Sequence, residues 1–379
     1  MGAANEQMPN VCRLARLCGG LIAVHNPGTN HADIATGLGV RVLARVTVPH
    51  FSAFVHALES QGLRVLGLEF IESERELNGA YPPRWRAFFP RHGWAVYEAI
   101  HDWRERSFSA HKKGDAAFAD LAARIAFGLA AAEERLRQTA LAYSAQLRGL
   151  QMRGELVSHA VFNDLHGLGV TLAIHAAFYD FGAIRDAIAE FLAHFVFKLG
   201  AAHRSWDMTK LVEALRSKSN GDGLADELLR ITNSRSSPKG WLYMMSQYRN
   251  LFMHVAPLQF TRSTRFAVQE MQSFGALGQL PLLYHPLPAD PGALKADRLA
   301  RLQERGQRDG SPDMGQIPGR TCEPDALEYL GTTLLMLAGF AHMVAARAPY
   351  ERMPIRLTDA DLVGGIRIHR DGSPDSEAS

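Results

Sequence analysis

Cysteine is scarce in this chain of 379 residues, and its three copies, Cys12, Cys18 and Cys322, form no CxxC pair. Isolated cysteines in odd number argue against a disulfide framework and a thiolate zinc site, and they are typical of a reducing cytosol. An excess of charge is also lacking, because 41 Lys and Arg residues balance 39 Asp and Glu residues. The net charge of +2 neither demands nor excludes a nucleic-acid partner, so any basic surface for one has to be local.

Common catalytic motifs are absent as well. The sequence has no HExxH, and His159, His166 and His175 have no carboxylate at the spacing of metal ligands. It has no GxxxxGK[ST] loop for nucleotide phosphates and no GxSxG nucleophile motif. We therefore expect no metal ion and no cofactor.

Membrane signals are weak. The apolar run LCGGLIAV, residues 17–24, is short and lacks a convincing cleavage site for a signal peptide. The stretch YLGTTLLMLAGFAHMVAA, residues 329–346, has no formally charged residue, but its length is borderline for a span and it contains His342. Leucines there recur at spacings of three and four, which predicts a buried bundle helix. We expect a soluble, cytoplasmic protein with no membrane partner.

The first third of the chain predicts a small mixed region. Val- and Leu-rich segments at 40–48 and 63–70 predict two strands, and the segment between them predicts a helix that ends at Gly62. Three prolines predict turns over residues 80–94. We expect residues 1–113 to form an α or α+β region with a regulatory or partner-binding role.

The rest of the chain is rich in helix-forming residues. Residues 114–153 predict a long helical connector, built as one helix or as two stacked helices. Residues 154–350 predict a helical bundle with an insertion at 257–323, and residues 351–379 predict a mostly disordered tail. The expected fold class is therefore mainly α, with a C-terminal antiparallel bundle and a smaller N-terminal region.

The segment WLYMMSQYRNLFMHV, residues 241–255, carries the strongest functional signal. We expect its helix to have Ser237 as N-cap, Pro238 at the first helical position and its end before Pro257. With about 100° between successive residues, one stripe is apolar and predicts the packed face. This stripe consists of Trp241, Met245, Tyr248, Phe252 and Val255.

The other side of this helix is polar but mostly uncharged. Asn250 and His254 lie together there, with Tyr243 and Gln247 beside them, and Arg249 lies on the flank. Such a face is suited to a protein interface or to the lining of a cleft. The ordinary alternative is a solvated helix face.

The string YRNLFMH is similar to the signature of the HEPN superfamily, in which an Arg, usually followed directly by Asn, precedes a His by four to six residues. The resemblance covers about residues 155–350. It implies an antiparallel helical bundle and a metal-independent endoribonuclease, of the kind found in toxin, phage-defence or RNA-processing systems. The implied catalytic residues are Arg249, Asn250 and His254, while Tyr243 and Gln247 would contact RNA or a partner subunit.

RNA cleavage by its own 2′-hydroxyl needs a base, an acid and positive charge on the phosphate. His254 is suited to the proton transfers, Arg249 to the phosphate, and Asn250 to orienting either group. One chain supplies one such histidine, so the resemblance implies a homodimer through the motif helix, with RNA as substrate and an antitoxin or sensor as a separate partner. Two alternatives stay open: a non-catalytic HEPN-like module that binds RNA or protein, and a purely structural all-α scaffold.

Overall fold

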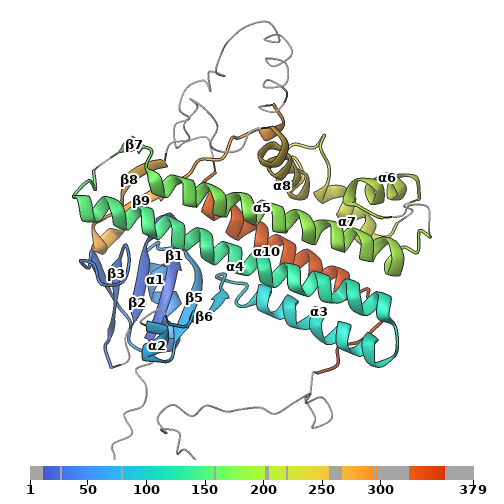
Figure 1. The fold of residues 1–379 in the computed structure, drawn as a ribbon, viewed down its shortest axis with the longest axis horizontal. Helices are drawn as coiled ribbons and strands as arrows, with labels where there is room; N and C mark the ends of the chain where they lie inside the picture. Colours follow the sequence, from blue (N-terminus) through green and yellow to red (C-terminus); the bar gives the residue numbers. More distant parts are fainter. Residues whose placement is uncertain are drawn as a thin grey trace, which may run out of the picture.

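The computed structural model describes residues 12–25, 28–77, 80–157, 159–200, 205–218, 221–255, 267–293, 296 and 324–354. Helices hold 56% of the residues and strands 17%, which makes the protein an α+β fold (Figure 1). The prediction of a mainly α fold dominated by a C-terminal bundle is therefore wrong. The N-terminal region contains a complete antiparallel sheet where two strands were expected, and a second, smaller sheet involves the C-terminal half.

The larger sheet has six strands in the order β4-β3-β2-β1-β5-β6. The predicted strands at 40–48 and 63–70 correspond to two of them, and the predicted helix corresponds to α1 (Phe54–Ser60), which follows the 3-10 turn η2 (Phe51–Ala53). The turns expected at 80–94 contain a further strand, so that prediction is wrong in part. The strands are β1 (Cys12–Leu17), β2 (Ile22–His25), β3 (His31–Ala35), β4 (Ala44–Thr47), β5 (Val65–Ile71) and β6 (Arg84–Ala87).

The centre of this sheet is buried along almost its whole length. In the middle of β1, Ala15 pairs with Ala23 on one neighbouring strand and with Leu68 on the other, and all three are buried. Helix α1 packs against β4 and β5, and the long helix α4 (Ala116–Arg153) contacts β1 and β6. Strands that are covered in this way lack the regular apolar–polar alternation of a half-exposed sheet, which is why the sequence does not mark β1 to β3 clearly.

Four helices form the other half of the core. α3 (Ala95–Lys112), α4, α5 (Leu165–Phe191) and α10 (Ala326–Ala345) pack lengthwise, with α10 in contact with the other three (Figure 1). The expected connector at 114–153 is one helix of 38 residues, capped by Asp115, whose carboxylate accepts the Phe118 N–H, and ended by Gly154 in the left-handed conformation. The shorter elements are α2 (Glu74–Leu77), α6 (Met208–Lys218), α7 (Gly223–Ile231), α8 (Trp241–Asn250), the 3-10 turn η1 (Cys18–Gly20) and the π-helical turns η3 (Leu192–Val196) and η4 (Leu251–Val255).

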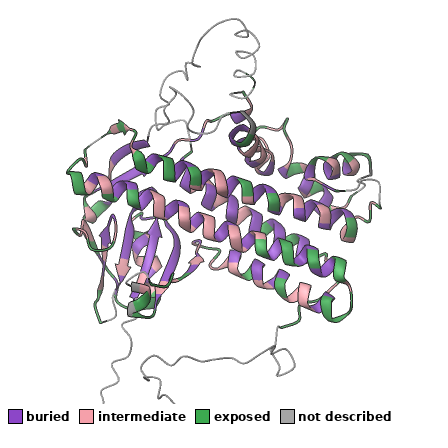
Figure 2. Ribbon diagram, viewed as in Figure 1, coloured by how far each residue is buried: buried purple, intermediate pink, exposed green. Residues whose placement is uncertain are grey.

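Two helices of the described residues are long and apolar enough to cross a membrane: α10 and the continuous stretch Leu165–Val196. In the most apolar window of each, 56% and 50% of the residues are buried inside the protein (Figure 2). The core helix of a soluble protein passes the same test as a membrane span. Cytoplasmic localisation therefore stays a prediction.

The smaller sheet has the strand order β7-β8-β9, with β7 (Ala160–Phe162), β8 (Ala267–Ser273) and β9 (Gln279–Tyr284), and the 3-10 turn η5 (Gly275–Leu277) joins the last two. The region expected as an insertion at 257–323 thus contributes a β-hairpin. One main apolar cluster extends from Ala15 in the large sheet to Ala345 in the last helix. The division of the chain at residues 113, 153 and 350 stays a prediction, and the tail expected to be disordered lies outside the described residues from 355 onward.

Candidate functional site

Helix α8, which carries the Arg-Asn string, starts later than the sequence predicts. Its N-cap is Gly240, while Ser237 and Pro238 lie in the preceding loop, joined by a cis peptide bond. A Cβ on Gly240 would lie 2.2 Å from the carbonyl oxygen of Ile231, the last residue of α7. Only glycine permits this close approach. The contact between Gly240 and the end of α7 therefore determines where α8 begins.

The predicted packing face of α8 is confirmed in its centre. Met245, Tyr248 and Phe252 are buried, while Trp241 is half-buried. The Tyr248 ring lies 4.9 Å from the ring of Tyr329 on α10, and its hydroxyl donates to the Pro288 carbonyl at 2.7 Å. These contacts fix the helix against the core and turn its other side outward.

The last part of the motif is not α-helical. α8 ends at Asn250, and the chain continues without a break into the π-helical turn η4. A π-helical turn is wider than an α-helical turn, so the angle between Asn250 and His254 differs from the one that a regular helix predicts. The backbone of His254 belongs to η4, but its side chain lies outside the described part of the structure.

Arg249 is half-buried at the contact between α8 and α5. Its Nη1 donates to Asn250 Oδ1 at 3.2 Å, so the structure brings these two predicted residues together. Its side chain lies against Gly182 of α5, where a Cβ would be 3.3 Å from Nε. Nε itself is buried without a hydrogen-bond partner among the described residues. The guanidinium is therefore held between Gly182 and the side-chain oxygen of Asn250.

Tyr243 and Gln247 are half-buried and lie about two turns and one turn before Asn250, respectively. Gln247 approaches the segment after Pro288, because a Cβ on Gly292 would lie 3.7 Å from Gln247 Oε1. The same segment is tied to the start of α8 by the ion pair of Lys239 and Asp290, at 3.0 Å. Gln247 thus lies on the side of α8 that faces residues 288–292.

Sequence reasoning missed Arg185 on α5. Its Nη1 donates to Ser246 Oγ at 2.7 Å, and its guanidinium also pairs with Asp186. Ser246 precedes Arg249 by three residues on α8, just as Gly182 precedes Arg185 on α5. Arg185 of α5 and Arg249 of α8 thus lie about one helical turn apart along the contact between the two helices. A local sequence pattern does not reveal this proximity, because the two residues belong to different helices.

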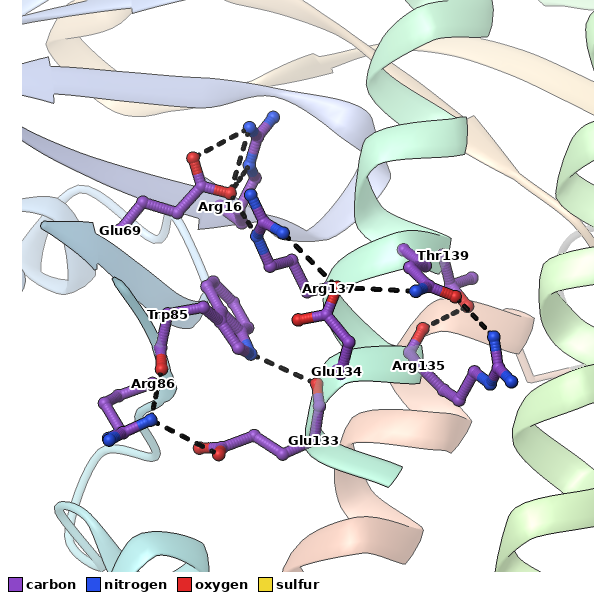
Figure 3. Close-up of polar contacts among 10 residues, drawn as sticks. Arg16, Glu69, Trp85, Arg86, Glu133, Glu134, Arg135, Arg137 and Thr139 are labelled. Atoms are coloured by element: carbon purple, nitrogen blue, oxygen red, sulfur yellow. Dashed lines mark hydrogen bonds and ion pairs between the residues drawn. The ribbon is translucent and has the colours of Figure 1, made fainter. Parts of the chain in front are cut away.

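A second concentration of charge lies between the large sheet and α4 (Figure 3). Glu69 of β5 accepts from Arg16 of β1, and its Oε1 lies 2.8 Å from Nε of Arg137 on α4. The three side chains are 3%, 9% and 12% exposed, so the pairs are almost completely shielded from water. Because both arginines bind one carboxylate, the cluster acts as an anchor between sheet and helix.

Glu133, four residues before Arg137, forms the neighbouring contact to β6. Its Oε1 accepts the Ala87 N–H at 2.8 Å, and its carbonyl oxygen accepts Trp85 Nε1–H at 3.1 Å. Burial raises the pKa of the Glu133 carboxyl from 4.5 to about 6. This carboxyl therefore titrates closer to neutrality than an exposed glutamate.

In the described parts of the chain, no group of three or more His, Cys, Asp and Glu residues is arranged to hold a metal ion. Comparisons with protein-family models, with curated proteins and with solved structures gave no match to this chain. The similarity to the HEPN superfamily rests on Arg249, Asn250 and His254 and on their place late in the chain, and it stays a prediction.

Proposed function

We propose that the protein is a metal-independent endoribonuclease of the HEPN type, with Arg249, Asn250 and His254 as its catalytic residues. The observation that supports this most is the fixed guanidinium of Arg249, which lies between Gly182 and the side-chain oxygen of Asn250. A guanidinium presents a planar fork of N–H donors, a geometry well suited to binding phosphate oxygens.

In the proposed reaction, a base takes the proton of an RNA 2′-hydroxyl, and the 2′-oxygen forms a bond to the adjacent phosphorus. The bond from phosphorus to the 5′-oxygen breaks, and an acid protonates this leaving oxygen. The products are a 2′,3′-cyclic phosphate and a 5′-hydroxyl. His254 serves as acid or base, Arg249 stabilises the charge on the phosphate, and Asn250 orients Arg249.

The π-helical turn that follows α8 gives this proposal additional support. Single π-helical turns inside helices occur frequently at functional sites, because the ordinary helix is more stable and the irregular one is kept for a reason. Here the irregular turn begins directly after Asn250 and contains His254.

The remaining features of the proposal concern partners. Proton transfer at both oxygens favours two histidines, which a two-fold homodimer supplies by bringing two copies of His254 to one cleft. Tyr243 and Gln247 would contact RNA or the second subunit. In this proposal the enzyme is a cytoplasmic toxin or phage-defence effector, held in check by an antitoxin or a sensor.

The test is cleavage of a labelled RNA by the purified protein in EDTA. Arg249→Ala and His254→Ala should each reduce the rate by about a hundredfold or more, because each removes a group that acts on the reacting atoms. His194→Ala, in the π-helical turn η3, and Arg235→Ala, in the loop before α8, are matched controls, since both residues are exposed and outside the motif. Equal rates for all five proteins would refute the proposal, whereas RNA binding without turnover by any of them would identify a non-catalytic binding module.

A further inference from the structure

A cavity of about 380 Å³ lies where the two sheets and the last helix meet. One wall is the connection after β1, with Leu17 and Gly19, and a second is Leu63 before β5. The β8–β9 hairpin supplies Phe274 and Tyr284. Gly19 permits this arrangement, because a Cβ there would lie 2.7 Å from Leu282 Cδ2 of β9. The volume lies within the range of about 300–1,000 Å³ that is usual for small-molecule sites.

The mouth of the cavity carries an ion pair. Arg64 Nη1 lies 3.4 Å from Glu328 Oε2 on the first turn of α10, and the two side chains are 52% and 40% exposed. Arg64 also donates to Thr332 Oγ1 at 3.3 Å. A half-exposed ion pair is weak, so a competing cation can replace Arg64. The Glu328 carboxylate is also exposed enough for such a cation to reach it.

The floor of the cavity is rigid. Asp325 accepts from the Tyr143 hydroxyl at 2.9 Å and from the backbone N–H of His285 at 2.8 Å, and it caps α10 through the N–H of Leu327. These bonds join α4, the strand end after β9 and α10. The cavity therefore keeps its shape without a ligand, which lowers the cost of binding.

Acidic groups outnumber basic ones around the cavity. Arg64 is the cation of its lining, against Asp325 and Glu328. Burial raises the pKa of the Cys18 thiol well above its usual value; the Glu328 carboxylate raises it further, Arg64 opposes this, and Asp325 adds to the rise. Burial followed by the same two carboxylates raises the pKa of Tyr284. Both residues stay protonated, so the charged side chains of the lining are two carboxylates and one guanidinium.

We propose that this cavity binds a small organic cation, such as an alkyl diamine, with its ammonium group on the Glu328 carboxylate and its carbon chain against Leu63 and Phe274. An ammonium group that approaches Glu328 competes with Arg64 and gains a charge-assisted hydrogen bond in a partly shielded site. The site uses none of the residues of the Arg-Asn-His motif. The test of this cation site therefore does not depend on the outcome of the ribonuclease test.

The test compares three probes of equal chain length by titration calorimetry of the whole protein: 1,4-diaminobutane, 1,4-butanediol and butanedioate. The diamine should bind with a dissociation constant of about 1 mM or below, and the diol and the dianion should bind at least about tenfold more weakly. Equal binding of the diamine and the diol, or no binding of the diamine, would overturn the proposal.

Two variants assign the binding to this cavity. Glu328→Gln should weaken binding of the diamine by about tenfold or more, while Arg64→Gln should strengthen it, because the competing cation is removed. Glu227→Gln, which removes a carboxylate from the surface pair with Arg230, is the matched control and should leave the affinity unchanged. Arg64 is half-exposed, so its variant keeps the test decisive if Glu328→Gln folds poorly. Identical affinities for Arg64→Gln and the wild type would place the diamine elsewhere.

Discussion

The side chain of Arg249 packs so closely against Gly182 that a single methyl group on this glycine would displace it. A Cβ on Gly182 would lie 3.3 Å from Arg249 Nε, which is tighter than ordinary contact, and 3.6 Å from its Cγ and Cδ. The arginine has to move by a few tenths of an ångström to make room. A neighbour on another helix thus controls where the guanidinium points.

We predict that Gly182→Ala reduces RNA cleavage by about tenfold or more, since small displacements of a positioned group are costly for catalysis. The free energy of unfolding should change by less than about 1 kcal/mol, because the better helix propensity of alanine offsets the crowding. Thermal unfolding and cleavage rates measured on the same preparation check both parts.

Gly169→Ala on the same helix is the control, as a Cβ there would meet no atom within 4 Å. It should stabilise the protein by about 0.5–1 kcal/mol and leave cleavage unchanged. The role given to Gly182 is refuted if both alanines have the same effect on cleavage.

Glu133 gives a prediction about pH. Its pKa in the folded protein is about 6, above the usual 4.5, so the folded state binds the proton more tightly than the unfolded state does. The resulting contribution to stability is fully present below about pH 4.5 and is lost as the pH rises through about 6. The difference between the two pKa values corresponds to about 2 kcal/mol. The pKa of Asp325 is raised to about 6 as well, so it acts in the same direction.

Glu133→Gln should therefore be more stable than the wild type at pH 7 by about 1–2 kcal/mol, and its stability should depend less on pH between 4.5 and 7. Glutamine keeps an oxygen for the Ala87 N–H but cannot ionise. Urea unfolding at a series of pH values measures this. A variant that is less stable than the wild type at pH 7 would show that the ionised carboxylate is stabilising.

At the scale of elements, the anchor of Arg16, Glu69 and Arg137 connects two central strands to the longest helix. We predict that Glu69→Gln lowers the free energy of unfolding by about 3–5 kcal/mol, because Arg16 is then left buried without its carboxylate partner and Arg137 loses its buried one. Chemical denaturation followed by circular dichroism measures the loss.

Glu134→Gln is the matched control on α4. Glu134 pairs with the same Arg137 but is 44% exposed, so its loss should cost less than about 1 kcal/mol. Similar losses for both variants would mean that burial of the cluster contributes nothing.

The same anchor explains why part of the sheet was not predicted. Arg16 lies inside a buried strand, where a local pattern treats it as a sign of exposure. Its partner Glu69 is 53 residues away, and Arg137 lies on α4, so the compensation becomes visible only in three dimensions. By contrast, α4 and α10 were recognisable because their signal is local: helix-forming composition in one and a regular leucine spacing in the other.

At the scale of the whole molecule, the fold class depended on pairings between distant segments. β1 pairs with β5 across the intervening strands and α1, and β7 pairs with β8 across more than 100 residues, as the pairing of Ala160 with Gln269 shows. The amino-acid composition favoured helices, and it contains no information about which distant segments pair as strands. The result was a mainly α prediction for an α+β protein.

The candidate site was predictable only along one helix. The position of Arg249 and Asn250 on a packed amphipathic helix followed from periodicity, whereas Gly182 and Arg185 come from another helix and were invisible. No sequence pattern predicts the change from an α-helix to a π-helical turn after Asn250.

The proposed cleavage of RNA by its own 2′-hydroxyl, with Arg249 and His254 at the site, leaves characteristic ends on the products. The most direct measurement is mass spectrometry of the ends that the protein produces from an RNA oligonucleotide in EDTA. We expect a 2′,3′-cyclic phosphate and a 5′-hydroxyl with the wild type and His194→Ala, about a hundredfold less product or lower with His254→Ala, and no product when the RNA carries 2′-deoxy residues. Products with a 5′-phosphate, or cleavage by His254→Ala at the wild-type rate, would contradict it.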